Sequence, residues 1–333
     1  MADYLGVSKW ARDPRAPRFC NVVLALPVII LLAFVRTASA QTPANPLWHE
    51  PKIRNYLPHM TWPEVTDLLT RTDMVILPVT SIEQHGLHGP LGTDFLNGLE
   101  RAKLVAQETD VLVAPILLPG NSPYHMGFAG TVTLPAQTIQ LVFFQAAQSL
   151  IRHGFKRFLI LNSHGGNQAI SRYIVDRINQ ETEGIAVELG EAAEPFLDRA
   201  ASPSTARPPG LRLFDRHGGV GETSDSLYLT PGLVNLEAAK PSTLTMPDHL
   251  ERMLPQVAAG DATALRVFLA EGLKADTTGK RTSAKEMSTT GAWSLGDPKE
   301  ATAERGRADT DRFVKGAVAF IERWKQLRPL GAK

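Results

Sequence analysis

Residues 74–94 read MVILPVTSIEQHGLHGPLGTD, and this stretch decides the fold class. The run MVILPV, at 74–79, is short, apolar and unbroken, which predicts a strand buried on both faces. Ionisable side chains then follow in SIEQHGLHGPLGTD, where the chain leaves the core. The sequence after Asp94, FLNGLERAKLVAQET, is typical of a helix. This part of the chain therefore predicts a strand, a polar loop and a helix, in that order.

The same order of elements recurs twice. VLVAPILL, at 111–118, leads to a loop and then to a helix predicted from Pro135 to His153, with Gly154 suited to end it. RFLILN, at 157–162, leads to SHGGN and to a helix through 173–180. Strands that alternate with helices predict an α/β protein, in which a mostly parallel sheet lies between two helical layers. Ligands of such sheets bind beyond the carboxyl ends of the strands.

The N-terminal residues have the three parts of a secretory signal peptide. Basic side chains precede an apolar run from Val22 to Val35, and Ala38-Ser39-Ala40 forms a small-x-small cleavage pattern before Gln41. The alternative is a membrane anchor, but this run is shorter than the roughly 20 residues that span a bilayer. The sequence therefore predicts cleavage near Ala40, export to the periplasm or the medium, and no stable membrane anchor afterwards.

Three segments are predicted from residue 1 onward. Residues 1–40 are the signal peptide, and the polar, Pro-containing residues 41–50 form a tether. Residues 51–328 form a single domain. ASPSTARPPG, at 201–210, is interpreted as a long surface loop of that domain, since too little chain follows it for a second core.

The charge of the mature chain excludes one class of partner. Removal of residues 1–40 takes away five basic and two acidic side chains, which changes the formal net charge from +1 to −2. No basic stripe remains, so nucleic acid is not an expected partner. The only cysteine, Cys20, is lost with the signal peptide. A metal site in the mature chain would therefore use His, Asp and Glu.

The stretch after the first strand is a candidate metal site. Glu83 and His85 are two residues apart, and side chains at this spacing share one face of an extended segment. Asp94 follows a turn rich in Gly and Pro that can fold back toward them. Carboxylate and imidazole together suit Zn²⁺, Mn²⁺ or Fe²⁺. Taken alone, the stretch fits a hydrogen-bonded polar loop equally well.

Two further pieces carry similar side chains. His164 ends the strand at 157–162, and the two glycines after it allow the backbone to approach another group closely. His217 lies five residues before Glu222, which falls near the start of a predicted helix. Each piece also has a structural reading, as a histidine that ends a strand and as a Gly-rich turn with a capping glutamate.

In combination, these motifs resemble the creatininase family of metal-dependent amidohydrolases. The matching segments are EQHG at 83–86, GTD at 92–94, NSHGGN at 162–167 and ETS at 222–224. They occur in the family's order, with HMGFAGTVTL at 125–134 as a weaker echo. The resemblance covers roughly Pro58 to Trp324.

The resemblance implies a site with two divalent metal ions per chain, with Zn²⁺ expected and Mn²⁺ or Fe²⁺ as alternatives. Glu83 and His164 would hold one ion, and His85 and Glu222 the other, with Asp94 bridging both. His217 and Glu222 are the implied catalytic residues, and His217 would protonate the leaving nitrogen. The implied reaction is hydrolysis of a non-peptide or cyclic C–N amide bond of a small molecule by a metal-bridging hydroxide. A homo-oligomer, frequently a hexamer in the family, is also implied.

Alternative functions share this site. The same fold serves in deformylation and in trimming of a precursor peptide, and a non-catalytic metal-binding scaffold is a third alternative. Arg216 replaces a glycine that is usual in the family, which suggests an anionic or carboxylate-bearing substrate. His88 and His125 lie in family-like segments, and the sequence assigns neither of them a role.

Overall fold

The computed structural model describes residues 42–115, 117, 119–198, 214–244, 248–272 and 283–332. The predicted signal peptide and the predicted loop at 201–210 lie outside these residues. The chain from Thr42 to Lys333 forms one compact unit. None of the helices in the described part is both long enough and apolar enough to cross a membrane.

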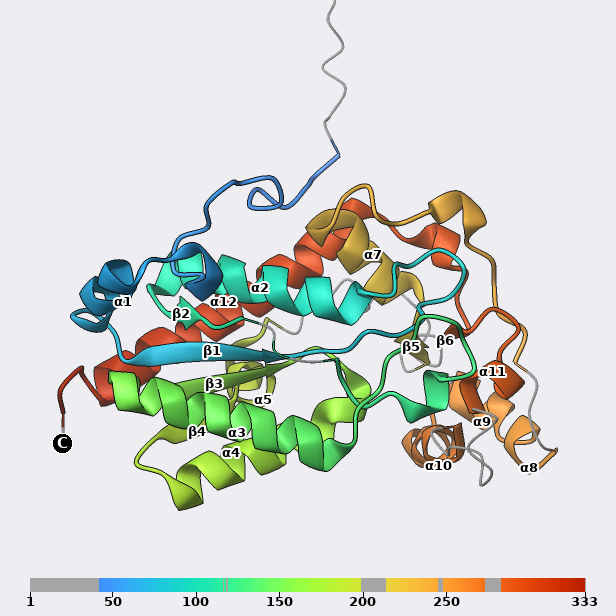
Figure 1. Cartoon of the computed structure of the whole chain (residues 1–333). Coiled ribbons are helices and arrows are strands. Elements are labelled where there is room, and N and C mark those ends of the chain that lie inside the picture. The colour runs from blue at the N-terminus through green and yellow to red at the C-terminus, as the bar shows by residue number, and fades with distance from the viewer. Residues whose placement is uncertain are drawn as a thin grey trace, which may run out of the picture. The chain divides into compact units, whose positions relative to one another are not determined.

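The centre of the fold is a sheet of four parallel strands in the order β2-β1-β3-β4 (Figure 1). The strands predicted at 74–79 and 157–162 are confirmed residue for residue as β1 and β3. The strand predicted at 111–118 is wrong in length, because Pro115 has no N–H with which to continue the ladder. The strands are β1 (Met74–Val79), β2 (Leu112–Val113), β3 (Arg157–Asn162) and β4 (Ile185–Glu188).

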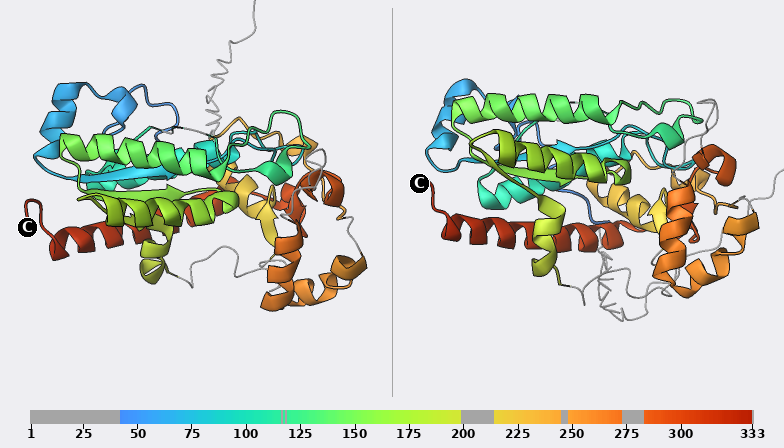
Figure 2. Two further views of the ribbon diagram at one scale, coloured as in Figure 1. Left: turned by 60° about the horizontal axis from the view of Figure 1, so that its bottom comes forward. Right: turned by 90° about the horizontal axis from the view of Figure 1, so that it is seen from below.

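Helices cover both faces of this sheet. Successive side chains of β1 point to opposite faces and all of them are apolar, so both faces must be covered. Val75, Leu77 and Val79 pack on one face with α1, α3 and α4, while Met74 and Ile76 pack on the other face with α2, α5 and α12 (Figures 1 and 2). The predicted three-layer α/β/α sandwich is confirmed. The first set is α1 (Trp62–Leu69), α3 (Ala136–His153) and α4 (Gln168–Glu181), and the second is α2 (Thr93–Thr109), α5 (Leu189–Ala193) and α12 (Ala303–Leu327).

The sequence predicts the end of α3 correctly but places the start of α2 too late. Gly154 ends α3 in the left-handed conformation, with a φ of 113°, as predicted. Helix α2 begins at Thr93, earlier than predicted, because Leu96 N–H already donates to Gly92 O at 2.8 Å. Asp94 therefore lies in the first helical turn of α2 and not in the loop before it.

A second region adjoins the sandwich and has its own apolar core. Two short antiparallel strands, β5 and β6, pair within it. The ring of Phe268 packs against those of Phe214 and of Trp293, which belongs to β6. Helix α7 leads from this region back to α2 and α12. The elements are β5 (Asp215–His217), α7 (Val220–Leu229), α8 (Asp248–Glu251), α9 (Leu254–Ala259), α10 (Ala262–Gly272), α11 (Ser283–Met287) and β6 (Trp293–Ser294). Short 3₁₀ turns lie at Leu57–His59, Pro123–His125, Gly165–Asn167, Glu194–Phe196, Leu236–Ala238 and Pro298–Glu300.

Candidate metal centre

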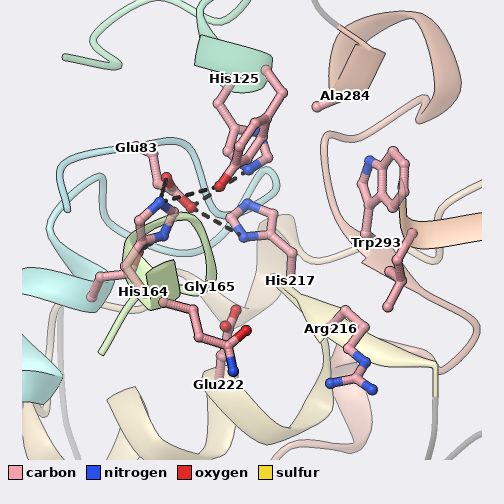
Figure 3. A pocket seen from close by; sticks show the side chains of 13 residues that line it. Glu83, His125, His164, Gly165, Arg216, His217, Glu222, Ala284 and Trp293 are labelled. Atoms are coloured by element: carbon pink, nitrogen blue, oxygen red, sulfur yellow. Dashed lines mark hydrogen bonds and ion pairs between the residues drawn. The ribbon is translucent and has the colours of Figure 1, made fainter. Parts of the chain in front are cut away.

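The predicted ligands after β1 and β3 meet at one edge of the sheet. The register pairs Val79 with Asn162, so both strands end at the same level. Glu83 and His164 follow these ends, and Glu83 Oε2 lies 3.4 Å from His164 Nε2. Both side chains are buried. Figure 3 shows the two side chains facing each other across the pocket floor.

Asp94 lies between two histidines. Its Oδ1 is 3.4 Å from His85 Nε2, and its Oδ2 is 3.0 Å from His164 Nδ1. Neither His85 Nε2 nor Asp94 Oδ2 makes a hydrogen bond within the described part of the chain. Buried polar atoms normally have hydrogen-bond partners, so a buried imidazole nitrogen and a buried carboxylate oxygen without one are suited to bind a cation. The carboxylate of Asp94 thus joins the two histidines through different oxygens.

Glu222 approaches from the opposite side, in the first turn of α7. Its Oε2 lies 3.7 Å from His85 Nε2 and accepts a hydrogen bond from the Gly218 N–H at 2.7 Å. The orientation of His85 is fixed by its other nitrogen, Nδ1, which lies 3.0 Å from the Glu83 carbonyl oxygen. A bond of this kind leaves Nε2 as the ligand atom. The structure therefore brings together all five predicted metal ligands.

His217 lies beside this group and stacks on a second histidine. Its Nδ1 is 3.4 Å from Glu83 Oε1, and its ring is 4.2 Å from that of His125. Burial lowers the pKa of His125 to about 3 and that of His217 well below its usual range. Both rings are therefore neutral near pH 7.

Gln84 fixes the tautomer of this histidine pair. Its side-chain nitrogen donates to Gly291 O at 2.9 Å and lies 3.0 Å from both His125 Nδ1 and His217 Nε2. Because His217 Nε2 also lies against the Gln84 backbone oxygen, the second amide proton is assigned to His125 Nδ1. The Gln84 carbonyl oxygen is 2.5 Å from His217 Nε2, which places the proton of His217 on that nitrogen. His217 Nδ1, which faces the site, is then free of a proton and can accept one.

Only glycine fits at position 166, next to His164. A Cβ there would lie 2.3 Å from both Asn121 O and Tyr124 Oη, which is far inside van der Waals contact. The same does not hold for Gly165, where a Cβ would meet nothing within 4 Å. The expectation that glycine permits close approach after His164 thus applies to the second of the two glycines.

The carboxylates of the site need positive charge beside them when they are ionised. Burial raises the pKa of Glu83, and it raises that of Glu222 to about 8. Burial acts against the charged form of His85 and His164 too, but Asp94 raises the pKa of His85 to about 10, and Glu83 raises that of His164 to about 9. Protons on these two imidazoles balance buried carboxylates, and divalent cations would supply the same positive charge instead.

Comparison with known proteins then identifies the family. Residues 58–321 match the family model for creatininase, described as creatinine amidohydrolase. The chain belongs to the creatininase family. The resemblance inferred from the sequence is confirmed.

Two relatives of this chain carry the names of different activities. The mycofactocin precursor peptide peptidase of Mycolicibacterium smegmatis is 28% identical over 258 residues, which cover 76% of this chain and 85% of the relative. The creatinine amidohydrolase of Pseudomonas putida is 31% identical over 196 residues, covering 55% of this chain and 74% of the relative. A solved structure described as "Creatininase Mn" superposes with a TM-score of 0.60 at 22% identity, covering 83% of this chain and 99% of that one, and shows the same fold.

The donor set of this creatininase-family chain fits a metal. Three groups of carboxylate and imidazole atoms each lie within 4.8 Å of one another. One of these groups consists of predicted ligands alone, the other two include His217, and His164 belongs to none of the three. Histidine nitrogen with carboxylate oxygen suits Zn²⁺ and Mn²⁺. The groups are Glu83, His125 and His217; His85, His217 and Glu222; and Glu83, His85 and Asp94.

A pocket of about 260 Å³ opens above these residues. Its described lining includes His125, Tyr124, Arg216 and Trp293 (Figure 3). The sequence alone assigned no role to His125 and did not point to Tyr124 or Trp293. For His125, the only sequence clue was its place in the family-like segment HMGFAGTVTL.

His88 is outside the described lining of this pocket. Its Nε2 lies 2.8 Å from Thr223 Oγ1, and its carbonyl oxygen accepts from Asn235 N–H at 2.9 Å. The histidine therefore connects the loop after β1 to helix α7, next to Glu222.

Proposed function

We propose that this member of the creatininase family is a hydrolase that uses two divalent metal ions to cleave a carbon–nitrogen amide bond in a small, non-peptide or cyclic substrate. The observation that carries the proposal is the position of Asp94. Its two oxygens face His85 and His164, at 3.4 and 3.0 Å, and so connect two separate carboxylate–imidazole pairs. A single structural ion would not need two such pairs.

The family resemblance assigns the residues that would hold the ions. Glu83 and His164 would bind one ion, His85 and Glu222 the other, and Asp94 both. Zn²⁺ is the expected ion, and Mn²⁺ and Fe²⁺ suit the same ligands. When bound, two such ions would lower the pKa of a water molecule and polarise the amide carbonyl.

His217 would transfer the proton. Its Nδ1 faces the site without a proton, and Nε2 is held by the carbonyl oxygen of Gln84. Nδ1 can therefore accept a proton from the attacking water and return it to the leaving nitrogen. The stacked ring of His125 limits rotation of the His217 ring.

A metal and activity assay tests the proposal. Mature protein is analysed for bound metal, and hydrolysis of a panel of cyclic and linear amides is measured before and after chelation. Two ions per chain with chelator-sensitive hydrolysis are expected. Bound metal without hydrolysis of any amide would favour the scaffold alternative, and hydrolysis that survives complete metal removal would overturn the proposal.

A second candidate is trimming of a precursor peptide. It is supported by the mycofactocin precursor peptide peptidase, of which the alignment covers 85%. Peptides in the same panel distinguish the two candidates, because a peptidase cleaves them faster than cyclic amides. The metal ligands and His217 would have the same roles in both reactions.

We further propose export and self-association. Export is supported by the signal-peptide pattern of residues 1–40, and a homo-oligomer, with a hexamer as the specific expectation, is supported by the family resemblance. Fractionation of cells that express the full-length chain tests the first, and light scattering of the mature protein tests the second.

A further inference from the structure

We propose that His125 is a catalytic residue that donates a hydrogen bond, from its Nε2–H, to the carbonyl oxygen of the amide that is cleaved. This inference rests on the proposed function and adds a residue to the same reaction. It is carried by the fixed orientation of the Gln84 amide, by the position of His125 beside His217, and by the pocket that both histidines line.

The side-chain amide of Gln84 fits in one orientation. Its Oε1 accepts from the Gly86 N–H at 2.9 Å, and its Nε2 donates to Gly291 O at 2.9 Å. A flipped amide would bring two donors together at Gly86 and two acceptors together at Gly291. Gly291 packs closely on this amide, since a Cβ there would lie 2.2 Å from Gln84 Oε1. The nitrogen of Gln84, and not its oxygen, therefore faces His125.

This contact decides which nitrogen of His125 carries a proton. Gln84 Nε2 lies 3.0 Å from His125 Nδ1, and an amide nitrogen only donates, so Nδ1 accepts. An imidazole whose Nδ1 accepts is neutral and carries its proton on Nε2. His125 Nε2 lies 3.5 Å from Glu83 Oε1, which is longer than an ordinary N–H···O hydrogen bond of about 2.9 Å. The Nε2–H can therefore donate to an atom of the substrate.

His125 and His217 lie next to each other beside Glu83. His125 Nε2 and His217 Nδ1 are 3.5 and 3.4 Å from the same oxygen, Glu83 Oε1, and Figure 3 draws both contacts as dashed lines. The two rings stack, with centroids 4.2 Å apart and an interplanar angle of 24°. The pocket therefore presents a hydrogen-bond donor and a proton acceptor side by side.

This pair matches the two polar atoms of one amide, which share a carbon. When the leaving nitrogen lies at His217 Nδ1, the carbonyl oxygen can reach the neighbouring His125 Nε2–H. Attack of water on the carbonyl carbon moves an electron pair of the C=O bond onto that oxygen, and a proton of the water passes to His217 Nδ1. The C=O bond then re-forms, the C–N bond breaks and the nitrogen leaves with that proton. A donor at the oxygen stabilises the charge that develops between these steps.

Two substitutions separate this role from a purely structural one. His125→Phe keeps a ring that can stack on His217 but removes the donor, whereas His125→Asn keeps an N–H donor and removes the stack. We expect kcat for the fastest amide of the panel to fall about 100-fold in His125→Phe, as for loss of one oxyanion donor, and to recover in part in His125→Asn. KM should change by less than about threefold, because the contact strengthens only as the charge develops.

Controls show that the variants are folded and loaded with metal. Metal content and the denaturant midpoint are measured for each variant, and His153→Phe, an exposed histidine at the end of α3, should leave kcat unchanged. Wild-type kcat in His125→Phe, or a larger loss in His125→Asn than in His125→Phe, would overturn the inference while metal-dependent hydrolysis stands.

The position of the proton is measured without substrate. Zinc-loaded mature protein with ¹⁵N-labelled histidine is studied by long-range ¹H–¹⁵N NMR, and His125→Phe assigns the signals. A proton on Nε2 of His125 supports the inference, and a proton on Nδ1 overturns it. A wild-type protein that hydrolyses no amide refutes the proposed function instead, and the NMR measurement alone then decides whether His125 offers a donor to the pocket.

Discussion

The two sides of the pocket are built in different ways. The sheet-edge group, defined as Glu83, His85, Asp94 and His164, follows directly from the strands and helix of the main core. The β5–β6 wall, defined as Arg216, His217 and Trp293, rests on a separate core around Phe214 and Phe268. We infer that the first region determines metal binding and that the second determines hydrolytic activity. Substitutions that affect one property without the other test this division.

The largest effect is expected from Asp94→Ala. Loss of the carboxylate that faces both His85 and His164 should remove both ions and lower kcat by about 1,000-fold or more. Elemental analysis and the amide assay measure the two effects. Glu108→Ala, an exposed acid on the same helix, is the control and should change neither. Full metal content in Asp94→Ala would show that the bridging assignment is wrong.

His217→Ala should lower activity without loss of metal. The ring belongs to the β5–β6 wall, so both ions should remain while kcat falls by about 100- to 10,000-fold, as for loss of a group that transfers a proton. His164→Ala, in the sheet-edge group, should instead lose metal. If His217→Ala loses an ion as well, His217 is a ligand and the division between the two regions fails at this residue.

Phe268→Ala tests the core under the β5–β6 wall. The ring is fully buried between Phe214 and Trp293, with centroid distances of 5.1 and 5.9 Å, so its loss should lower the free energy of unfolding by about 3–5 kcal/mol. The hydrolytic activity should fall while the metal content stays the same. Val267→Ala, an exposed neighbour in α10, is the control for denaturant unfolding and activity. Metal loss in Phe268→Ala alone would show that the two regions are not separable.

The smallest effect is expected from His88→Phe, which removes the contact between the loop after β1 and α7. Loss of one buried hydrogen bond to Thr223 should lower the free energy of unfolding by about 1 kcal/mol, with both ions retained. Thr223→Val removes the same bond, so the double variant should be no less stable than the less stable single variant. Additive losses would contradict the assigned contact.

The contrast between the two regions also explains what the sequence could predict. MVILPV and RFLILN are continuous apolar runs, and polar residues that follow parallel strands must meet at one edge of the sheet. The convergence of Glu83 with His164 follows from that geometry. The exact start of α2, and with it the place of Asp94 in a helical turn, depends on capping contacts at Gly92 that composition does not reveal.

The β5–β6 wall was beyond sequence analysis because its parts are far apart in the chain. Asp215–His217 and Trp293–Ser294 are too short to show a strand period, and their pairing is a tertiary event. Arg216 was noticed only as a departure from a family pattern, and Trp293 gave no motif at all. The neutral state of His217 likewise depends on burial, and its tautomer depends on the contact with Gln84; no local pattern indicates either of them.

One contact of Glu222 links metal loading to the measurement of specificity. The oxygen of Glu222 that faces His85 is the same oxygen that accepts the Gly218 N–H, and Gly218 directly follows the β5–β6 wall. An ion that draws on this oxygen shares it with the backbone that carries Arg216 and His217. A preparation with mixed metal occupancy would then be a mixture of pockets, and its substrate profile would be an average. Metal content should therefore be reported with every specificity value, just as temperature and pH are.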